Sequence, residues 1–442
     1  MRRRLLGRAL PRPLAWVGAC VLGWAIAALA SAMAIAEEPA ALPDALPPLD
    51  DSAMGETPPV RLFADARLRA GLEAARDLTR GDGAATVGIG GKAGVEAQLD
   101  FGRLTVAVGE AGTLGPEDGA RELVPRAPLA PLLRAELALD TTLFGLPAEL
   151  AVGRAPAVIA DGRMLGDEPF DLRGRTLDGA RARVHGGTVD VGVGAWWLGG
   201  AGDTLAAVAA ADGALAVGEQ LDLEVWLVTE RDAVDAVVVP TLGTRLAGRL
   251  WFLQGRAATE LQGALDDATL ERHGLAGRVS AGARATLEPD ALPLSLPSLF
   301  VDLDGDLVAG DAVGGRVLRA PAPTLHGVRG ALDLLAPDNT WRAALALGLH
   351  EDRLSSSLTA LVVGVVDRAG PLLDPWGAPV PARRGGGTGV ALWELDLELA
   401  ARLTDDLRLG VLWGIAAPGP ALVGELPAQR LLVELRAATD GS

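Results

Sequence analysis

Apolar and polar residues alternate along most of the chain after residue 59, and an alternation with a period of two predicts β-strands. In the segment 61–73 the even positions from Leu62 to Leu72 are apolar, whereas most odd positions carry arginine, aspartate or glutamate. Similar runs recur at 95–100, 134–140, 221–227, 278–287, 393–399 and 431–436. Turn signals rich in glycine and aspartate separate the runs, for example at 81–83 and 116–119, which predicts many antiparallel strands.

Two architectures give every strand one apolar and one polar face. A soluble sandwich buries the apolar face between two sheets, whereas a membrane barrel turns it outward against lipid. Because one uniform pattern runs through residues 60–442, we expect an all-β fold, a transmembrane antiparallel β-barrel. At roughly 10 residues per membrane strand plus turns, this length predicts about 16–18 strands. Alanine is abundant at 204–214 and 261–274, where we expect short helices or loops.

The N-terminus has the plan of a secretory signal peptide. Arginines at positions 2–4 precede an apolar run over 14–35, which ends in Ala34-Ile35-Ala36 before two glutamates. Cleavage after Ala36 would remove Cys20, the one cysteine, so the mature chain would form no disulfide. A retained membrane helix is the alternative. Residues 37–59 are rich in proline, alanine and acidic residues, so the expected organisation is a signal peptide at 1–36, a flexible leader at 37–59 and a barrel at 60–442.

Charge and aromatic content refine this expectation. The chain carries 40 basic and 57 acidic residues, and removal of residues 1–36, which hold five arginines, gives 35 − 57 = −22. Nucleic acid is therefore not an expected partner, because phosphate needs a concentrated basic surface. The sequence has no tyrosine, 6 phenylalanines and 10 tryptophans. Membrane barrels carry aromatic girdles, so we expect tryptophan to supply part of one.

Signatures of catalysis and of metal binding are scarce. The histidines at 185, 273, 326 and 350 do not have metal-ligand spacing, and no phosphate loop or Gly-x-Ser-x-Gly motif occurs. We therefore expect no enzyme, no cofactor and no metal. Asp302, Asp304 and Asp306, with Asp311, resemble part of a calcium loop, but the glycine stands too early and no glutamate closes the loop. An acidic external loop is the simpler interpretation.

One block of sequence is more specific. It reads Gly153-Arg154, then Asp161-Gly162-Arg163-Met164-Leu165-Gly166, and then Gly174-Arg175-Thr176-Leu177-Asp178-Gly179-Ala180-Arg181. Its order and spacing resemble the signature of the alginate export family of outer-membrane porins, in which Gly153, Gly162, Gly166, Asp178 and Gly179 belong to the structural motif. Weaker similarities, such as Thr241-Leu242-Gly243-Thr244-Arg245-Leu246, extend the resemblance over 60–437. Ala155 departs from the family, which has glutamine there.

The resemblance implies a passive channel in a bacterial outer membrane, surrounded by lipid and inserted by the barrel assembly machinery. Its expected cargo is a polysaccharide, an oligosaccharide or a small solute, and an anionic cargo would suit the arginines described next. Two other hypotheses are a non-conducting structural barrel of the cell envelope and a secreted soluble β-sandwich that binds a ligand.

Candidate pore residues come from the same block. On a strand over 176–184, Arg175, Arg181 and Arg183 share one face, which in a barrel is the lumen. Guanidinium groups bind carboxylates and phosphates, so we expect these three residues, together with Arg154 and Arg163, to line the pore and select anions. The alternative is that the arginines pair with lumen carboxylates and hold the barrel in shape.

Two further expectations concern the ends of this block. Arg154 and Arg163 flank the segment 155–170, which we expect to fold inward and narrow the pore. Asp178 shares the lipid face with Ala180, where a charge is costly at the membrane centre. We therefore expect Asp178 to lie near a strand end or to pair with an arginine.

Overall fold

The described part of the chain consists of strands, turns and loops. The computed structural model describes residues 60–74, 83–114, 132–166, 175–199, 205–218, 220–232, 237–250, 252–267, 269, 271–287, 298–311, 332, 334–336, 338–367, 370, 372–374, 379–382, 389–424 and 426–440. The expected signal peptide and leader lie outside these residues. Within them, no helix is long and apolar enough to cross a membrane.

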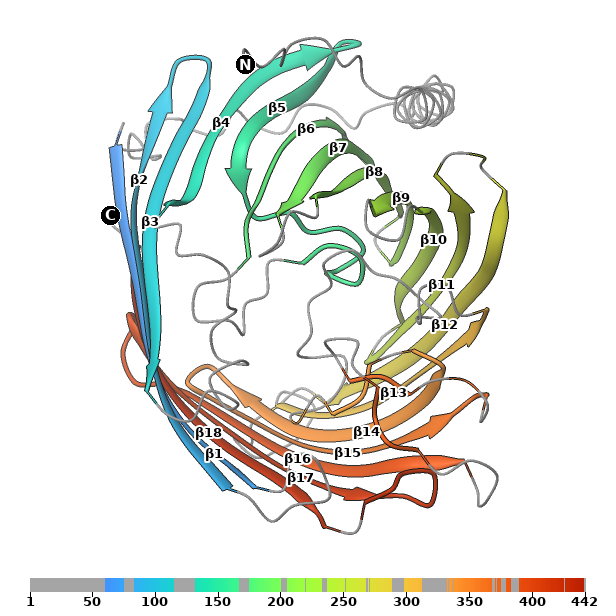
Figure 1. The fold of residues 1–442 in the computed structure, drawn as a ribbon. Helices are drawn as coiled ribbons and strands as arrows, with labels where there is room; N and C mark the ends of the chain where they lie inside the picture. Colours follow the sequence, from blue (N-terminus) through green and yellow to red (C-terminus); the bar gives the residue numbers. More distant parts are fainter. Residues whose placement is uncertain are drawn as a thin grey trace, which may run out of the picture.

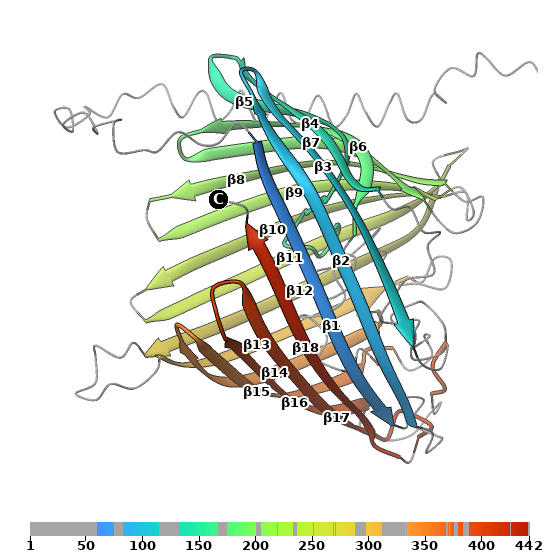
Figure 2. The ribbon, with the colours of Figure 1, turned by 90° about the vertical axis from the view of Figure 1, so that its left-hand side faces the viewer.

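Eighteen antiparallel strands form one closed sheet, in which each strand pairs with its neighbours in sequence and β1 pairs with β18 (Figure 1). The strands are tilted relative to one another and wind around a central space (Figure 2). Their bounds are β1 Val60–Ala74, β2 Gly83–Leu99, β3 Gly102–Leu114, β4 Leu132–Leu143, β5 Leu146–Ala155, β6 Leu177–Gly186, β7 Val189–Gly199, β8 Leu205–Val217, β9 Leu221–Asp232, β10 Val237–Leu250, β11 Leu253–Asp266, β12 Arg272–Leu287, β13 Ser298–Gly310, β14 Thr340–Glu351, β15 Leu354–Val365, β16 Val390–Arg402, β17 Leu407–Pro418 and β18 Ala428–Asp440.

The barrel closes at a seam between its first and last strands. β1 and β18 pair in antiparallel register over twelve residue pairs. Three ion pairs between arginines and carboxylates cross this seam on the inner face: Arg69–Glu434, Arg430–Glu73 and Arg436–Asp65. The seam is therefore joined by side chains as well as by the backbone.

The two ends of the barrel differ in the length of their connections. At the end that holds both barrel termini, which we call the turn end, most connections are turns of two to four residues, such as Phe144–Gly145, and the longest is 288–297. Phe144 and Gly145 have φ values of 55° and 82°, as in the type I′ turns whose twist matches paired strands. At the opposite end, which we call the loop end, the connections include 156–176 and 311–339. Short turns at one end and longer loops at the other are typical of outer-membrane barrels.

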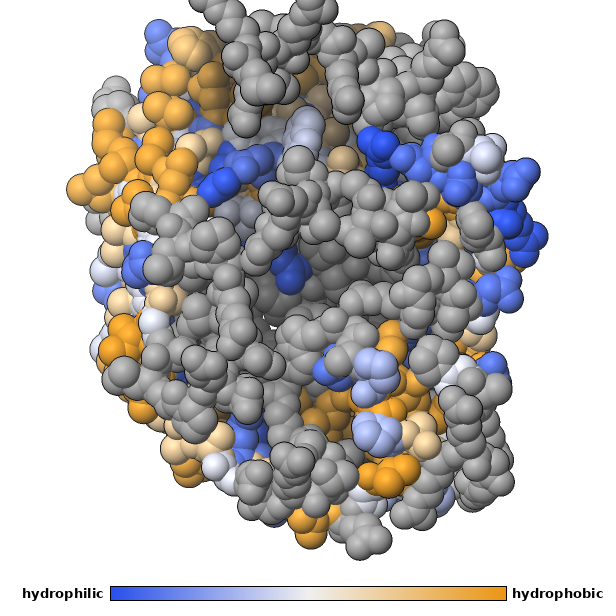
Figure 3. Space-filling view, in the orientation of Figure 1, coloured by the Kyte–Doolittle hydropathy of each residue, from blue (hydrophilic) through white to orange (hydrophobic). Residues whose placement is uncertain are grey.

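The apolar face of each strand points outward. In β1, Leu62 and Leu72 are 63% and 56% exposed, whereas Asp65, Arg67 and Arg69 on the opposite face are buried in the barrel interior. Figure 3 shows apolar residues gathered along the outside of the wall formed by β1–β3. The predicted transmembrane antiparallel β-barrel is confirmed, and its eighteen strands fall within the predicted range. A soluble sandwich is excluded, since the apolar faces do not pack against a second sheet.

Exposed aromatic residues mark both ends of the outer face. Trp197 and Trp393 lie near the loop end, at the end of β7 and the start of β16. Phe101, Phe144 and Phe252 lie in connections at the turn end. Aromatic side chains at these two heights form the girdles of a membrane barrel, so tryptophan supplies part of one, as predicted.

Two alanine-rich segments differ from the expectation. Most of the two segments expected as helices or loops, 204–214 and 261–274, is instead strand. The first lies in β8 from Leu205 on, and the second covers the end of β11 and the start of β12, with the connection 267–271 between them as the part that agrees with a loop. Each of these strands has a hydrogen-bonded neighbour on both sides, which satisfies the backbone as well as a helix would. Sheet pairing here overrides the helix propensity of alanine.

The acidic segment around Asp304 also differs from the expectation. Asp302, Asp304 and Asp306 alternate along β13 and face arginines inside the barrel, so they form neither a calcium loop nor an external loop. Asp311 accepts a hydrogen bond from the Leu275 backbone N–H at 3.1 Å. Among the described residues, no group of three or more His, Cys, Asp or Glu side chains is placed to hold a metal ion.

Candidate functional site

Residues 156–166 leave the wall after β5 and fold into the barrel, and we call this segment the inner loop (Figure 1). Its tip is a tight turn in which Ile159 N–H donates to Leu165 O at 2.9 Å. Ala160, Asp161 and Gly162 all have positive φ, which lets the chain reverse within a few residues. The sequence predicted an inward fold for this segment.

An apolar contact seats the inner loop on the wall. Ile159, Met164 and Leu165 are almost fully buried. They belong to one cluster of buried residues with wall residues from β6, β7, β8, β9 and β11, namely Leu177, Trp196, Val208, Ala210, Trp226, Val228 and Ala258. Burying an aliphatic side chain of this size contributes about 1.5–3 kcal/mol, so the seat is a strong anchor.

Polar contacts hold the tip of the inner loop to β10 and β12, next to the seat. Asp161 pairs with Arg245 of β10 at 2.5 Å, and Arg245 also pairs with Glu224 of β9 at 3.1 Å. Arg163 donates to Ser280 Oγ of β12 at 2.8 Å. Burial lowers the pKa of the Arg163 guanidinium, as does the positive charge of nearby Arg278. The loop therefore crosses part of the lumen and narrows it.

Trp226 packs against the inner loop within this cluster, and a glycine leaves room for its indole. Its register partner Gly243 has no side chain, and a Cβ there would stand 2.1 Å from Trp226 Cε2. We expect Gly243→Ala to push the indole into the loop and to destabilise the barrel by about 1–3 kcal/mol, as overpacking does. The midpoint of the heat-induced mobility shift on a gel measures this change.

Gly255→Ala is the matched control for that variant. Gly255 also lies within a strand pair of β10 and β11, but a Cβ there meets nothing within 4 Å. The control should unfold at or slightly above the native midpoint, since alanine restricts the unfolded chain. Equal midpoints for the two variants would contradict the account of the seat.

Beside the inner loop, arginines and aspartates form a ladder across β11–β14. Arg278 and Asp306 are buried and lie 3.2 Å apart. Arg342 pairs with Asp304 at 2.7 Å. The remaining pairs of the ladder are Arg284–Asp302, Arg256–Asp302 and Arg256–Asp304. The wall that receives Arg163 is thus a network of opposite charges.

The other candidate arginines of the lumen carry carboxylate partners too. Arg181 lies on the inner face and pairs with Glu136 at 3.0 Å and Glu149 at 3.2 Å. Arg183 likewise pairs with Asp190 at 2.7 Å and Asp212 at 3.6 Å. Arg175 lies two residues before the start of β6. These pairs agree with the alternative that the arginines stabilise the wall, and their role toward solutes stays a prediction.

Arg154 does not lie in the lumen, and this corrects the expectation. It is the register partner of Ala135 and Asp178, whose outward neighbours Val152 and Trp197 are exposed. Its Nε and Nη2 donate to the two oxygens of Asp178 at 2.7 and 2.6 Å. The pair lies at the loop end of the outer face, so Asp178 has the strand-end position and the arginine partner that the sequence predicted.

The glycines of the motif lie around these features. Gly153 has a φ of 128°, and a Cβ would stand 2.0 Å from Ala135 O, so a side chain cannot fit between β4 and β5. Gly162 and Gly166 lie in and after the turn of the inner loop, and both are buried. Gly179 of β6 lies against Trp196.

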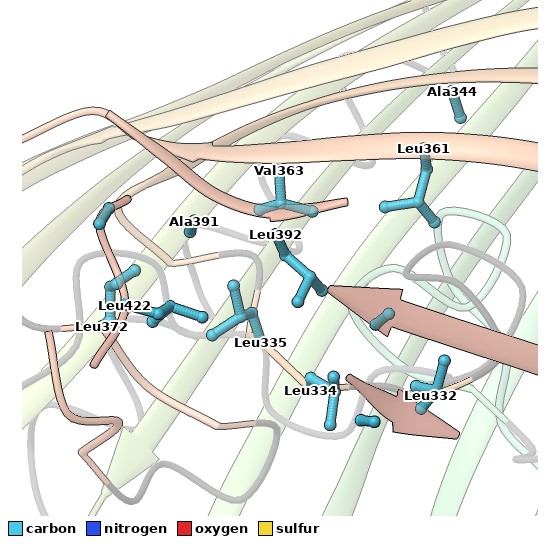
Figure 4. Close-up of a cluster of buried hydrophobic side chains, with 13 residues drawn as sticks. Leu332, Leu334, Leu335, Ala344, Leu361, Val363, Leu372, Ala391, Leu392 and Leu422 are labelled. Carbon is cyan, nitrogen blue, oxygen red and sulfur yellow. The ribbon is translucent and has the colours of Figure 1, made fainter. Parts of the chain in front are cut away.

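A second group of inward loops, which we call the mouth platform, lies at the loop end against β14–β18. Leu332, Leu334 and Leu335 pack with Leu372 and Leu422 onto wall residues that include Leu361, Val363 and Leu392 (Figure 4). Asn339 fastens the platform to the β15–β16 connection, because its side-chain amide exchanges two 2.7 Å hydrogen bonds with the backbone of Asp367. This platform was not predicted from the sequence.

Similarity to known proteins is visible in structure alone. No family model and no curated protein matches the chain. The chain superposes on Acinetobacter baumannii OccAB2 with a TM-score of 0.60 at 12% identity, over 86% of this chain and 98% of that one. The chain has the fold of the Occ and Opd outer-membrane porins. For Acinetobacter baumannii OccAB4 the TM-score is 0.55 at 8% identity, and the match covers 87% of this chain and 99% of that one. For Pseudomonas aeruginosa OpdK with vanillate the TM-score is 0.54 at 12% identity, and the match covers 86% of this chain and 99% of that one.

Several residues that hold the inner loop escaped the sequence analysis. Ser280, Glu224 and Trp226 bear no local motif, because their partners lie far along the chain. A signal existed for Gly243 and Arg245, which fall inside the second motif, 241–246. The structure joins the two motifs through the Asp161–Arg245 pair.

Proposed function

We propose that the protein is a porin-like channel of a bacterial outer membrane, through which small hydrophilic solutes pass by diffusion. The observation that carries this proposal is one closed barrel with an apolar outside, a charged inside and a loop folded into the lumen. Lipid surrounds the outer face, and the barrel assembly machinery inserts the chain.

We further propose that the solutes are small anions. Arg181 and Arg183 are each about two-fifths exposed to the lumen despite their carboxylate partners. The inner loop favours small solutes over a polymer, because it occupies part of the lumen. OpdK is described with vanillate, a small aromatic carboxylate, whereas the resemblance to alginate export porins suggests an anionic saccharide. Both candidates carry a carboxylate that a guanidinium can bind.

Planar-bilayer recording of the purified protein tests the proposal. We expect stepwise conductance, with a reversal potential in a salt gradient that indicates anion preference. At about 6 Å in water a unit charge changes an ion's energy by about 0.7 kcal/mol, a factor of about three in concentration. The Arg181→Gln and Arg183→Gln variants should therefore lose about threefold in anion preference, and they also release carboxylates that attract cations.

Arg402→Gln serves as the control, since Arg402 is exposed at the turn end and pairs with Asp405 of the adjacent turn. Its reversal potential should equal that of the native protein. A folded protein that never conducts would contradict the channel and favour a non-conducting structural barrel, whose lumen the inner loop and mouth platform would fill. An unchanged anion preference in both lumen variants would refute the role of the arginines but not the channel function.

A further inference from the structure

Glu260 lies on β11 beside the inner loop, and its register partner on β12 is Arg278, which pairs with Asp306. Its side chain is 1% exposed. Among the described residues, neither carboxylate oxygen accepts a hydrogen bond. Within the same part of the chain, its ion pair is with Arg163 Nη1 of the inner loop, at 3.9 Å. A buried carboxylate without hydrogen bonds is costly unless a nearby cation compensates it.

Arg163 depends on Glu260 in return. The charged groups that act on Arg163 are Arg278 and Arg245, which repel it, and Glu260 and Asp306, which attract it. Asp306 already pairs with Arg278 at 3.2 Å, and Asp161 of the loop pairs with Arg245. Glu260 is thus the carboxylate left to balance Arg163. An arginine cannot escape burial by losing its proton, so without Glu260 it gains by leaving the wall.

We propose that Glu260 is the positioning residue of the inner loop: its negative charge holds Arg163, and through it the loop, inside the lumen. The consequence for solute passage rests on the proposed channel function, but the position of the loop does not. Removing the charge of Glu260 leaves the apolar seat intact but weakens the hold on Arg163. The inner loop then spends more time away from the wall.

Thiol labelling measures the position of the loop without any conduction. Cys20 is the one natural cysteine, so a Cys20→Ser background accepts single reporters. Met164→Cys places a thiol in the buried seat, and Val158→Cys places one on the exposed side of the same loop. The measured quantity is the labelling rate of Met164→Cys divided by that of Val158→Cys, both in detergent. This ratio reports how often the inner loop leaves its seat, because the intrinsic reactivity of a thiol cancels. In Glu260→Gln, which keeps the size of the side chain, we expect this ratio to rise roughly tenfold.

A double-mutant cycle separates charge from packing. Arg163→Gln should raise the ratio as Glu260→Gln does, and the double variant should exceed neither by much, because both remove one interaction.

Two results would overturn the proposal: an unchanged ratio in Glu260→Gln, or fully additive effects in the cycle. A heat-modifiability gel verifies that each variant is a folded barrel, and Arg163→Gln supplies the test if Glu260→Gln does not fold. If the protein never conducts in bilayers but the labelling ratio changes as expected, the channel function is refuted and the role of Glu260 stands.

Discussion

Replacing Leu358 by arginine is expected to lower the free energy of unfolding in lipid by about 2–4 kcal/mol, the cost of an arginine near the middle of the bilayer on the outside of a barrel. Leu358 lies in β15 on the outer face, and its register partners are Leu347 and Leu397. The guanidinium would therefore enter hydrocarbon with no carboxylate beside it. Urea unfolding in phospholipid vesicles measures the change.

Ser357→Arg is the control, because the preceding residue faces the lumen. Its register partner Glu398 offers a carboxylate, and the side chain would lie in water. We expect a change of at most about 1 kcal/mol, as for an exposed ion pair. If the two variants lost equal stability, the assignment of faces would be wrong.

Asp306→Ala is expected to cost about 3–5 kcal/mol, since it leaves a buried arginine without its carboxylate. The side chains of Arg278 and Asp306 are only 6% and 8% exposed, and Arg342 Nε also lies 3.9 Å from Asp306. Denaturant unfolding of the barrel in vesicles gives the free energy of the variant.

The comparison for this prediction is an exposed pair of similar geometry. Arg402 and Asp405 lie 2.7 Å apart, with side chains 46% and 88% exposed. Asp405→Ala should change the free energy of unfolding by no more than about 1 kcal/mol. The double variant Arg278→Met/Asp306→Leu should recover most of the loss, because a buried ion pair is replaceable by apolar groups of similar volume. A small loss in Asp306→Ala would mean that water enters the ladder.

The faces of the strands were predictable because the alternation depends only on neighbouring residues. Leu62 to Leu72 point outward as the pattern of β1 requires. The same reasoning failed at 204–214, where an alanine-rich strand lacks the contrast between its faces. Alanine fits either a helix or a strand, and only the pairing of β8 with β7 and β9 decides.

The position of Arg154 was not predictable from its own motif. Its direction follows from the pairing of β5 with β4, which places it opposite Ala135. Gly153 immediately before it has a φ of 128°, but the register with β6 continues without a shift, so Arg154 shares the outer face with Leu150 and Val152. Its expected place in the lumen came from the motif and not from this alternation, and its partner Asp178 lies 24 residues further along the chain.

The inner loop was predictable only in part from its own sequence. Its inward fold was predicted from the sequence motif alone, for the segment that Arg154 and Arg163 flank. Its anchors were not, because Ser280 lies 117 residues from Arg163 in the sequence. Only closure of the barrel brings β12 within reach of the β5–β6 connection.

The seam between β1 and β18 has a consequence for biogenesis. Its partners are separated by about the whole length of the domain, and the Arg69–Glu434 bond alone spans 365 positions. Loop-closure entropy delays contacts of such high sequence separation. Until the last strand has been made, the first keeps an open edge that can recruit foreign strands. We therefore propose that this edge is shielded until β18 has been made.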